Sequence, residues 1–215
     1  MKRLAIIGGG DLGLQLANLA RTTGIYSVCG FFDDTRNRGD VIVGAEVLGE
    51  LADIPSSFAQ GGFDCLVVAI GYKHIALRDA IHAEHAGSIP FATLIHPSAI
   101  VDPTCQIGQG AVIYPGCVLD MEAMIGANTV VNAGCVIAHH SNIGSGCFIS
   151  PAVSIAGFVS VEPGCVLGIG TIVIDNLRIA SGCRTGAGAV VTCDLEKRGL
   201  YLGVPARLAR EVPAP

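Results

Sequence analysis

Residues 129–149 read TVVNAGCVIAHHSNIGSGCFI, with an aliphatic residue at every sixth position from Val131 onward. The same period runs without insertion from Leu94 to Leu195, through seventeen repeats, and sixteen of the seventeen marker residues are aliphatic. Neither a helix of period 3.6 nor a strand of period 2 produces a strict period of six. The period predicts a parallel β-helix, in which each of three faces takes one hexapeptide and one coil takes eighteen residues.

The cysteines follow this period. Six of the nine lie at the small position two residues before a marker, namely Cys105, Cys117, Cys135, Cys147, Cys165 and Cys183. That position is predicted to face inward, where a free thiol packs as a small hydrophobe. We therefore expect buried, inert thiols there. The remaining Cys29, Cys65 and Cys193 show no CxxC spacing and no metal-binding pattern.

Composition narrows the function classes. The chain has 215 residues, a net charge of −5, 5% aromatic residues and no tryptophan, which argues against nucleic-acid binding. No run of about 18 uncharged apolar residues is present, so we expect no membrane span. The apolar start Leu4–Ile7 ends at Gly8, too early for a signal peptide, and we expect a cytoplasmic protein.

Residues 1–92 lack the six-residue period and predict a Rossmann-like α/β domain. Strands are expected at 4–7, 27–32 and 64–70, with helices from Leu12 and over 74–85. The β-helix domain is expected over 93–196 and a C-terminal tail over 197–215. Within the tail, residues 201–207 are expected to close the repeat, and the remaining Pro-bearing residues are expected to be flexible.

A glycine motif lies between the first predicted strand and helix, formed by Gly8, Gly10 and Gly13, with Asp11 inside it. Glycines let a backbone approach phosphate, and a helix N-terminus offers unpaired N–H groups. Asp33 and Asp34 follow about 20 residues later, where dinucleotide folds place a ribose-binding carboxylate. Because some 90 residues make half of a dinucleotide fold, we expect one nucleoside diphosphate in place of NAD.

The six histidines divide into two groups. His74, His82 and His85 lie on or near the second predicted helix, where we expect solvated side chains, and His96 at the edge of the repeat is treated alike. The pair His139–His140 follows the marker Ile137 by two and three residues, which places it at a corner of the coil.

Counting in eighteens gives this pair its neighbours, because stacked residues lie about one strand spacing apart, roughly 4.8 Å. Gly157 is one coil above His139, and Glu122 is one coil below His140. A histidine beside a glycine N–H can act as a general base next to an oxyanion donor.

Several segments resemble the bacterial hexapeptide sugar acyltransferases: 131–140, Ile143-Gly144, Ile149-Ser150-Pro151, Ala156-Gly157, 167–170 and 203–207. The most similar group joins a small nucleotide-binding domain to a left-handed β-helix. It includes nucleotide-aminosugar N-acetyltransferases of surface-glycan pathways and sialic acid O-acetyltransferases. The resemblance implies acetyl transfer from acetyl-CoA to a nucleotide-linked sugar, without a metal, in a homotrimer whose active sites lie between subunits.

The resemblance also implies roles for individual residues. His139 matches the general base, and the Gly157 N–H matches the group that binds the thioester carbonyl. For the acetyl-CoA site it implies Ile169 and Ala187, joined by Pro205 of the 203–207 segment. For the nucleotide sugar it implies Asp33, Asp34 and Gly71, with the Gly8–Gly13 loop near the phosphates.

Two positions depart from the family pattern. His140 stands where the family usually has Asp or Glu, and a neutral imidazole cannot supply that carboxylate. Our hypothesis is that Glu122 supplies it, directly or through His140. Asp11 stands where the family often has Gly, which weakens the expected nucleotide contacts of the loop.

The leading prediction is an N-acetyltransferase for a nucleotide-linked amino-dideoxy sugar, such as a 4-amino-4,6-dideoxyhexose, in lipopolysaccharide or O-antigen synthesis. The sequence leaves open O-acetylation of a sialic acid or another sugar. A β-helix carbonic anhydrase would need three histidines around zinc, but the repeat offers only His139, His140 and, at its edge, His96. A non-enzymatic structural or nucleotide-sensing trimer is the last alternative.

Overall fold

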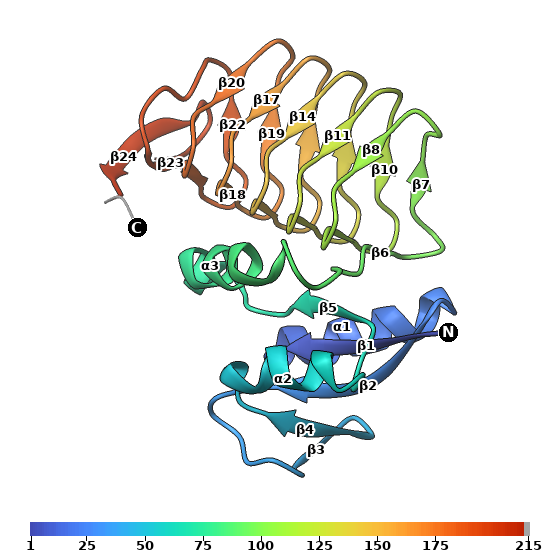
Figure 1. Cartoon of the computed structure of the whole chain (residues 1–215). Coiled ribbons are helices and arrows are strands. Elements are labelled where there is room, and N and C mark those ends of the chain that lie inside the picture. The colour runs from blue at the N-terminus through green and yellow to red at the C-terminus, as the bar shows by residue number, and fades with distance from the viewer. Residues whose placement is uncertain (213–215) are drawn as a thin grey trace. The chain divides into compact units, whose positions relative to one another are not determined.

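The computed structural model describes residues 1–212 and divides into two compact units, Met1–Leu94 and Ile95–Pro215 (Figure 1). Residues 213–215, the last three of the predicted tail, lie outside the described part. Between residues 1 and 212, no helix is long and apolar enough to cross a membrane.

The first unit contains a five-stranded sheet with the order β3-β4-β2-β1-β5. Its strands are β1 (Lys2–Ile7), β2 (Tyr26–Phe32), β3 (Val41–Ile42), β4 (Ala45–Gly49) and β5 (Cys65–Val68). All neighbours pair in parallel except β3 and β4. Parallel strands buried on both faces read as continuous apolar runs, which is why β1, β2 and β5 are predictable from the sequence.

The helical elements of this unit are α1 (Asp11–Thr23), η1 (Leu51–Asp53), α2 (Ile54–Ala59), η2 (Tyr72–His74) and α3 (Ile75–His85). The apolar periodicity locates α1 and α3 but misses the β3–β4 hairpin. The hairpin turns at Val43 and Gly44, where φ is 41° and 79°, and Gly44 is the residue in the sequence that could have indicated it. Two consecutive residues with positive φ are typical of a two-residue hairpin turn.

The expectation of solvated histidines on α3 is wrong for His85, which is only 5% exposed. The buried face of α3 consists of Ile75, Arg78, Ile81 and His85, so the histidine follows the helical period of the core. His82 is half-buried, with its ring 4.4 Å from the ring of Phe91. Burial, followed by the positive charge of Arg78, lowers the pKa of His82.

The second unit is a β-helix of three parallel sheets, which we name after their first strands. The β7 sheet contains β7 (Ile100–Val101), β10 (Val118–Leu119), β13 (Val136–Ile137), β16 (Ser154–Ile155), β19 (Ile172–Val173) and β22 (Val190–Val191). The β8 sheet contains β8 (Gln106–Ile107), β11 (Met124–Ile125), β14 (Asn142–Ile143), β17 (Ser160–Val161) and β20 (Arg178–Ile179). The β6 sheet begins with β6 (Leu94–Ile95), β9 (Val112–Ile113), β12 (Val130–Val131), β15 (Phe148–Ile149), β18 (Val166–Leu167) and β21 (Arg184–Thr185).

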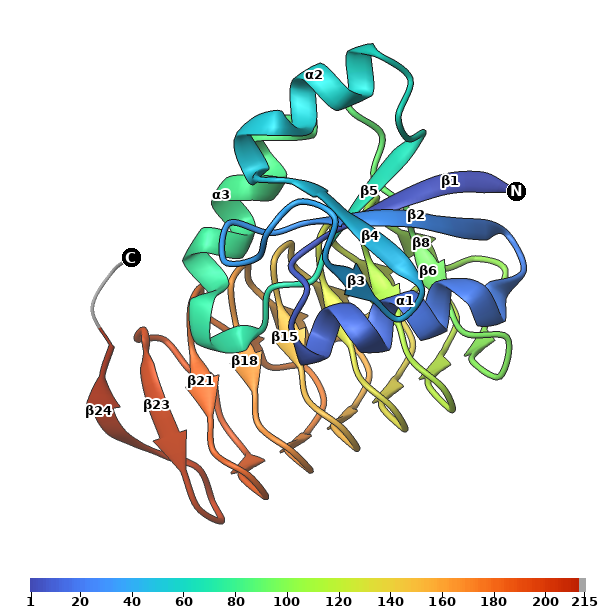
Figure 2. The same cartoon turned by 90° about the horizontal axis from the view of Figure 1, so that it is seen from below.

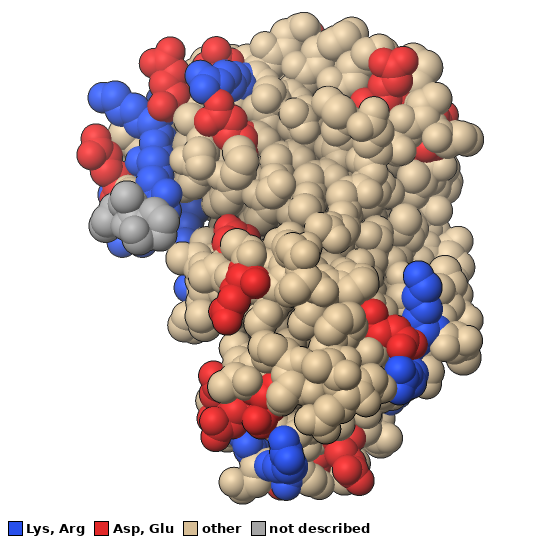
Figure 3. Space-filling model, viewed as in Figure 1, with Lys and Arg blue, Asp and Glu red and all other residues tan. Residues whose placement is uncertain are grey.

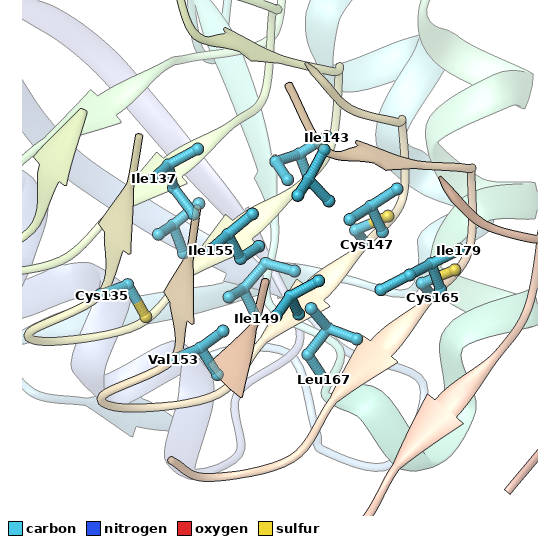
Figure 4. Close-up of a cluster of buried hydrophobic side chains, with 14 of the residues drawn as sticks. Cys135, Ile137, Ile143, Cys147, Ile149, Val153, Ile155, Cys165, Leu167 and Ile179 are labelled. Carbon is cyan, nitrogen blue, oxygen red and sulfur yellow. The ribbon is translucent and has the colours of Figure 1, made fainter. Parts of the chain in front are cut away.

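The register confirms the eighteen-residue coil. Val118 pairs with Val136 and Leu119 with Ile137, and the same offset recurs between the repeat strands of all three sheets. The marker side chains point inward and pack on one another, as Figure 4 shows for Ile137, Ile149 and Ile155. From Ile113 to Val191 every marker is buried.

The side chains at the small positions of the repeat also form hydrogen bonds. Cys135 Sγ donates a hydrogen bond to Ser150 O at 3.1 Å, fifteen residues ahead. The same step joins Cys105 to Asp120, Cys117 to Asn132, Thr129 to Gly144, Ser141 to Ala156, Cys147 to Glu162 and Cys165 to Ala180. Each bond satisfies a carbonyl where the chain enters a corner. All nine cysteines are free, and of the six repeat cysteines only Cys105 is partly exposed.

The flexibility expected for the tail beyond Arg207 is wrong as far as Glu211. β23 (Gly199–Leu202) pairs in parallel with β21, and β24 (Arg207–Glu211) pairs with β23 in antiparallel orientation. Figure 2 shows β21, β23 and β24 side by side, extending the β6 sheet. Lys, Arg, Asp and Glu side chains gather near this end of the β-helix in the view of Figure 3.

Candidate functional site

One corner of the β-helix, between the β7 and β8 sheets, carries the predicted catalytic residues. We call residues 121–122, 139–140, 157–158 and 175–176 the histidine corner. The second residue of each pair, namely Glu122, His140, Phe158 and Asn176, has φ between 56° and 61°, in the left-handed region. Hydrogen bonds hold the levels together: the His140 N–H donates to Met121 O at 3.0 Å, and the Phe158 N–H to His139 O at 3.1 Å.

Glu122, His140 and His139 form a line of contacts. His140 Nε2 lies 3.2 Å from Glu122 Oε2, and His140 Nδ1 lies 3.2 Å from His139 Nδ1. Both imidazoles are half-buried. The carboxylate thus contacts the second imidazole, which contacts the first, while His139 Nε2 takes no part in either contact.

Gly157 lies directly against the ring of His139. A Cβ at Gly157 would be 2.7 Å from His139 Cε1 and 2.9 Å from Nε2, closer than such contacts allow. Its φ is not in the left-handed region, so the glycine is required by this close approach and not by backbone strain. Gly157 is buried, and within residues 1–212 its N–H has no hydrogen-bond acceptor.

Ser141 orients that N–H. Ser141 Oγ donates to Ala156 O at 2.7 Å and accepts a hydrogen bond from the Val159 N–H at 3.1 Å. Because a trans peptide places its C=O and N–H on opposite sides, a carbonyl bonded to the interior directs the Gly157 N–H outward. Sequence reasoning misses this residue, although its polar hydroxyl at an inward position is a usable signal.

Phe158 completes the corner. Its ring stacks on His140, with centroids 4.9 Å apart and an interplanar angle of 26°, and meets His139 edge-on at 5.2 Å and 84°. The sequence places Phe158 one coil above His140 but does not indicate these ring contacts, which depend on side-chain rotamers.

The predicted nucleotide-binding residues of the first unit meet at one edge of its sheet. Gly8 follows β1 with φ 103°, and a Cβ on Gly13 would lie 2.1 Å from Gly8 O, so both glycines are needed to pack the loop against α1. A Cβ on Gly10 or on Gly71 would meet nothing within 4 Å, so both backbones are open to approach. Asp11 is exposed at the first turn of α1.

Asp33 is 9% exposed, and its buried carboxylate holds the Gly8–Gly13 loop in place. Its carboxylate accepts hydrogen bonds from the Gly9 N–H at 2.6 Å and from Thr35 N–H and Oγ1 at 2.8 and 2.6 Å. Burial by itself would raise the pKa of Asp33, but the bonds from Thr35 and Gly9 outweigh it and hold the pKa below its usual range. Asp34 is exposed and accepts a hydrogen bond from the Leu51 N–H.

The predicted acetyl-CoA residues lie at another corner, between the β6 and β7 sheets. We call residues 115–116, 133–134, 151–152, 169–170 and 187–188 the glycine corner. Ile169 is exposed here with Ala187 one coil above it, and the Gly188 N–H donates to Ile169 O at 2.8 Å. Pro205 is exposed in the loop between β23 and β24, whose Gly203 O accepts from the Val190 N–H of β22. Within one chain, Ile169 and Ala187 are therefore not at the histidine corner.

No group of three or more His, Cys, Asp or Glu side chains in the described part of the chain is arranged to hold a metal ion. His96, at the edge of the repeat, has Nδ1 bonded to Ser98, with Nδ1–Oγ at 2.8 Å.

Comparison with known proteins places the chain in a family. The model of the PglD N-terminal domain matches residues 3–84. A histidine-to-asparagine mutant of perosamine N-acetyltransferase from Caulobacter crescentus, solved with CoA and GDP-perosamine, is 30% identical, with a TM-score of 0.90 over 98% of each chain. The acetyltransferase domain of PglB from Neisseria gonorrhoeae FA1090 is 30% identical, with a TM-score of 0.88 over 97% of this chain and 100% of that one.

The same PglB domain in complex with acetyl coenzyme A is 29% identical, with a TM-score of 0.87 over 96% of this chain and 98% of that one. The curated protein sequences contain no significant match. The similarity to the solved structures spans both units, which confirms the fold class and the resemblance stated from the hexapeptides. The chain therefore belongs to the hexapeptide-repeat sugar acetyltransferases and is an acyltransferase.

Proposed function

We propose that the protein transfers the acetyl group of acetyl-CoA to the amino group of a nucleotide-linked amino-dideoxy sugar, with His139 as general base. Perosamine N-acetyltransferase, solved with CoA and GDP-perosamine, supports both the thioester donor and an amino-sugar acceptor. Within the chain, the observation that carries the proposal is the histidine corner, where Glu122, His140, His139 and Gly157 are in contact in that order.

The contacts define one proton arrangement that satisfies every group. His139 carries its proton on Nδ1 and donates to His140 Nδ1, while His140 carries its proton on Nε2 and faces Glu122. His139 Nε2 then holds a free lone pair. A base needs this lone pair to accept a proton from the attacking amine.

The reaction follows as direct attack. The sugar nitrogen forms a bond to the thioester carbonyl carbon, and its proton passes to His139 Nε2. The positive charge can move to His140 through the Nδ1–Nδ1 contact, where the Glu122 carboxylate stabilises it. Collapse of the tetrahedral intermediate breaks the C–S bond, and the CoA sulfur leaves with that proton as the thiol.

Gly157 supplies the oxyanion donor in this proposal. Its outward N–H lies beside the base, so it can meet the carbonyl oxygen as negative charge develops. A donor of this kind contributes about 3–4 kcal/mol of transition-state stabilisation in enzymes where it has been removed. Ser141 holds the donor through the Ala156 carbonyl.

The positions of the two corners support a homotrimer. The β7 sheet lies between the glycine corner and the histidine corner, and its outward side chains include exposed Ile100, Val136 and Ile172. Exposed aliphatic side chains in one column favour burial against another copy. Packing β7 sheets around a threefold axis brings the glycine corner of one subunit toward the histidine corner of the next. Ile169, Ala187 and Pro205 would then line the acetyl-CoA site from the neighbouring subunit.

For the first unit we propose nucleotide binding at the edge formed by the Gly8–Gly13 loop, Asp34 and Gly71. The open backbones at Gly10 and Gly71 support this role. Asp33 acts indirectly, because its carboxylate already accepts bonds from Gly9 and Thr35. The nine free cysteines suit a reducing compartment, in line with a cytoplasmic enzyme that makes precursors for surface glycans.

Release of CoA thiol with a panel of acceptors tests the proposed function. The panel contains UDP-, dTDP- and GDP-linked 4-amino-4,6-dideoxyhexoses, the corresponding 4-hydroxy sugars, and free and CMP-linked sialic acid. We expect turnover with at least one amino sugar and none with its hydroxyl counterpart. Turnover with sialic acid alone would replace the proposal by O-acetylation. The alternatives of a carbonic anhydrase and a non-enzymatic trimer lose their support, since the chain belongs to an acyltransferase family.

A further inference from the structure

Phe158 occupies a backbone conformation that suits it poorly. Its φ is 59°, and a bulky residue in the left-handed region is an outlier among proteins. Residues held in such regions persist where the surroundings over-determine them, and they cluster at functional sites. The β-helix requires only a residue with positive φ at such a corner. At the glycine corner, Gly134 and Gly170 meet that requirement. Turning the chain therefore does not explain the choice of phenylalanine.

The ring of Phe158 does not fill the core either, because the residue is 53% exposed. Its ring contacts the two imidazoles, with a stack on His140 and an edge-on contact with His139. The imidazoles also meet each other edge-on, with centroids 5.3 Å apart at 86°. Three rings thus brace one another, and edge-on and stacked geometries of this kind are the favourable ones for aromatic pairs.

We propose that Phe158 is a positioning residue that holds the imidazole pair in its working geometry. This inference rests on the proposed function. The stack fixes the plane of His140, so that Nδ1 faces His139 while Nε2 faces Glu122. When the proton taken from the acceptor moves to His140, the face of the phenyl ring lies against the resulting cation, which it attracts.

The groups facing His140 support this division of roles. Glu122 faces it with a negative charge, His139 with a titratable ring and Phe158 with an apolar face. Glu122 contacts His140 through a ring nitrogen, whereas Phe158 contacts it through the ring face. Removing the ring leaves the hydrogen-bonding groups in place but frees His140 to rotate away from them.

Phe158→Gly and Phe158→Tyr test the inference, with Val43→Gly as the matched control. Glycine suits φ 59°, so Phe158→Gly removes the ring without straining the backbone, and we expect no loss of melting temperature. We expect kcat to fall about 10-fold at unchanged KM for both substrates, as a misplaced catalytic group would cause. Phe158→Tyr, which keeps the ring face, should restore kcat.

Val43→Gly relaxes the left-handed position of another exposed apolar residue, in the β3–β4 turn, where φ is 41°, and should not change kcat. Wild-type kinetics in Phe158→Gly would overturn the inference, as would equal losses in Phe158→Gly and Phe158→Tyr.

A second measurement separates this inference from the proposed function. NMR of the imidazole ring protons reports whether His139 and His140 keep their mutual contact in Phe158→Gly, whatever the acceptor. Loss of the cross-peak between the two rings in Phe158→Gly, and its return in Phe158→Tyr, supports positioning. An unchanged cross-peak contradicts it. Failure of the wild type to acetylate any amino sugar would instead remove the proposed function and leave the ring result standing.

Discussion

Two corners of the same β-helix form the same left-handed backbone turn with different residues. At each level both corners place a residue in the left-handed region. The glycine corner uses Gly116, Gly134, Ala152, Gly170 and Gly188, whereas the histidine corner uses Glu122, His140, Phe158 and Asn176. Left-handed backbone costs non-glycine residues about 1–2 kcal/mol each. Asparagine tolerates this region, but Glu122, His140 and Phe158 accept the cost at three consecutive levels, which supports a requirement beyond folding at the histidine corner.

The contrast extends to how each corner treats its glycines. Gly134 has φ 71°, and a Cβ there would meet nothing within 4 Å, so glycine serves the backbone alone. Gly157 needs no unusual φ, and glycine serves the close approach of His139. The same residue type thus serves the backbone at one corner and the close approach of the proposed catalytic ring at the other. The following predictions test that distinction, from the largest expected effect to the smallest.

Gly157→Ala should lower kcat about 100-fold while leaving the melting temperature nearly unchanged. The added Cβ would lie 2.7 Å from His139 Cε1, so the base must move, and misplacement of about 1 Å can cost this much. Steady-state kinetics and thermal unfolding measure the two effects. Gly87→Ala, where a Cβ meets nothing within 4 Å, is the control. Full activity in Gly157→Ala would contradict the close contact at this corner.

Glu122→Gln should lower kcat about 10-fold. The amide keeps the shape of the side chain but removes the negative charge that faces His140 Nε2 at 3.2 Å. Steady-state kinetics measures the loss. Glu162→Gln, which removes the carboxylate paired with Arg178, is the control. If Glu122→Gln leaves the rate unchanged, the carboxylate has no part in the reaction.

Ser141→Ala and Thr129→Val compare the same hydrogen bonds at two corners. Each hydroxyl donates to a corner carbonyl at 2.7 Å and accepts from a backbone N–H at 3.1 Å. Both variants should lose about 1 kcal/mol of unfolding free energy in a denaturant titration. Only Ser141→Ala should lower kcat, by roughly fivefold, because only its carbonyl belongs to the peptide that presents the Gly157 N–H. Equal kinetics in the two variants would separate Ser141 from catalysis.

Gly134→Ala should affect stability alone. The new side chain has free space, so the loss comes from the positive φ and amounts to about 1 kcal/mol of unfolding free energy. Denaturant titration measures the loss, and kcat should equal that of the wild type. A fall in kcat at unchanged stability would contradict a purely structural role for this glycine.

The sequence predicts the β-helix and its register because residues eighteen positions apart stack on one another in successive coils. Counting in eighteens alone places Gly157 beside His139 and Glu122 beside His140. It does not reach the contacts of Phe158, since ring orientation depends on rotamers that the period leaves open. The thiol and hydroxyl donors at the small positions are likewise missed, because the period reports size and not hydrogen bonding.

The first unit is less predictable for a related reason. Its buried strands show in apolar runs, but the role of Asp33 depends on which oxygen meets Gly9 and which meets Thr35. A polar residue such as His85 is expected in solvent, whereas its helical position belongs to the buried face. β24 escapes prediction because all five of its residues are exposed, and an exposed edge strand lacks an apolar pattern.

Kinetics and binding of His139→Asn test the central claim most directly. Asparagine keeps a polar side chain but cannot act as a base at Nε2, so we expect kcat/KM to fall by about 10²–10⁴-fold. The Kd of the nucleotide sugar, measured by calorimetry, should stay within about twofold of the wild type, because the base in this account takes a proton and contributes little to binding. Retention of most of the activity at unchanged affinity would contradict His139 as the general base and with it the functional role of the histidine corner.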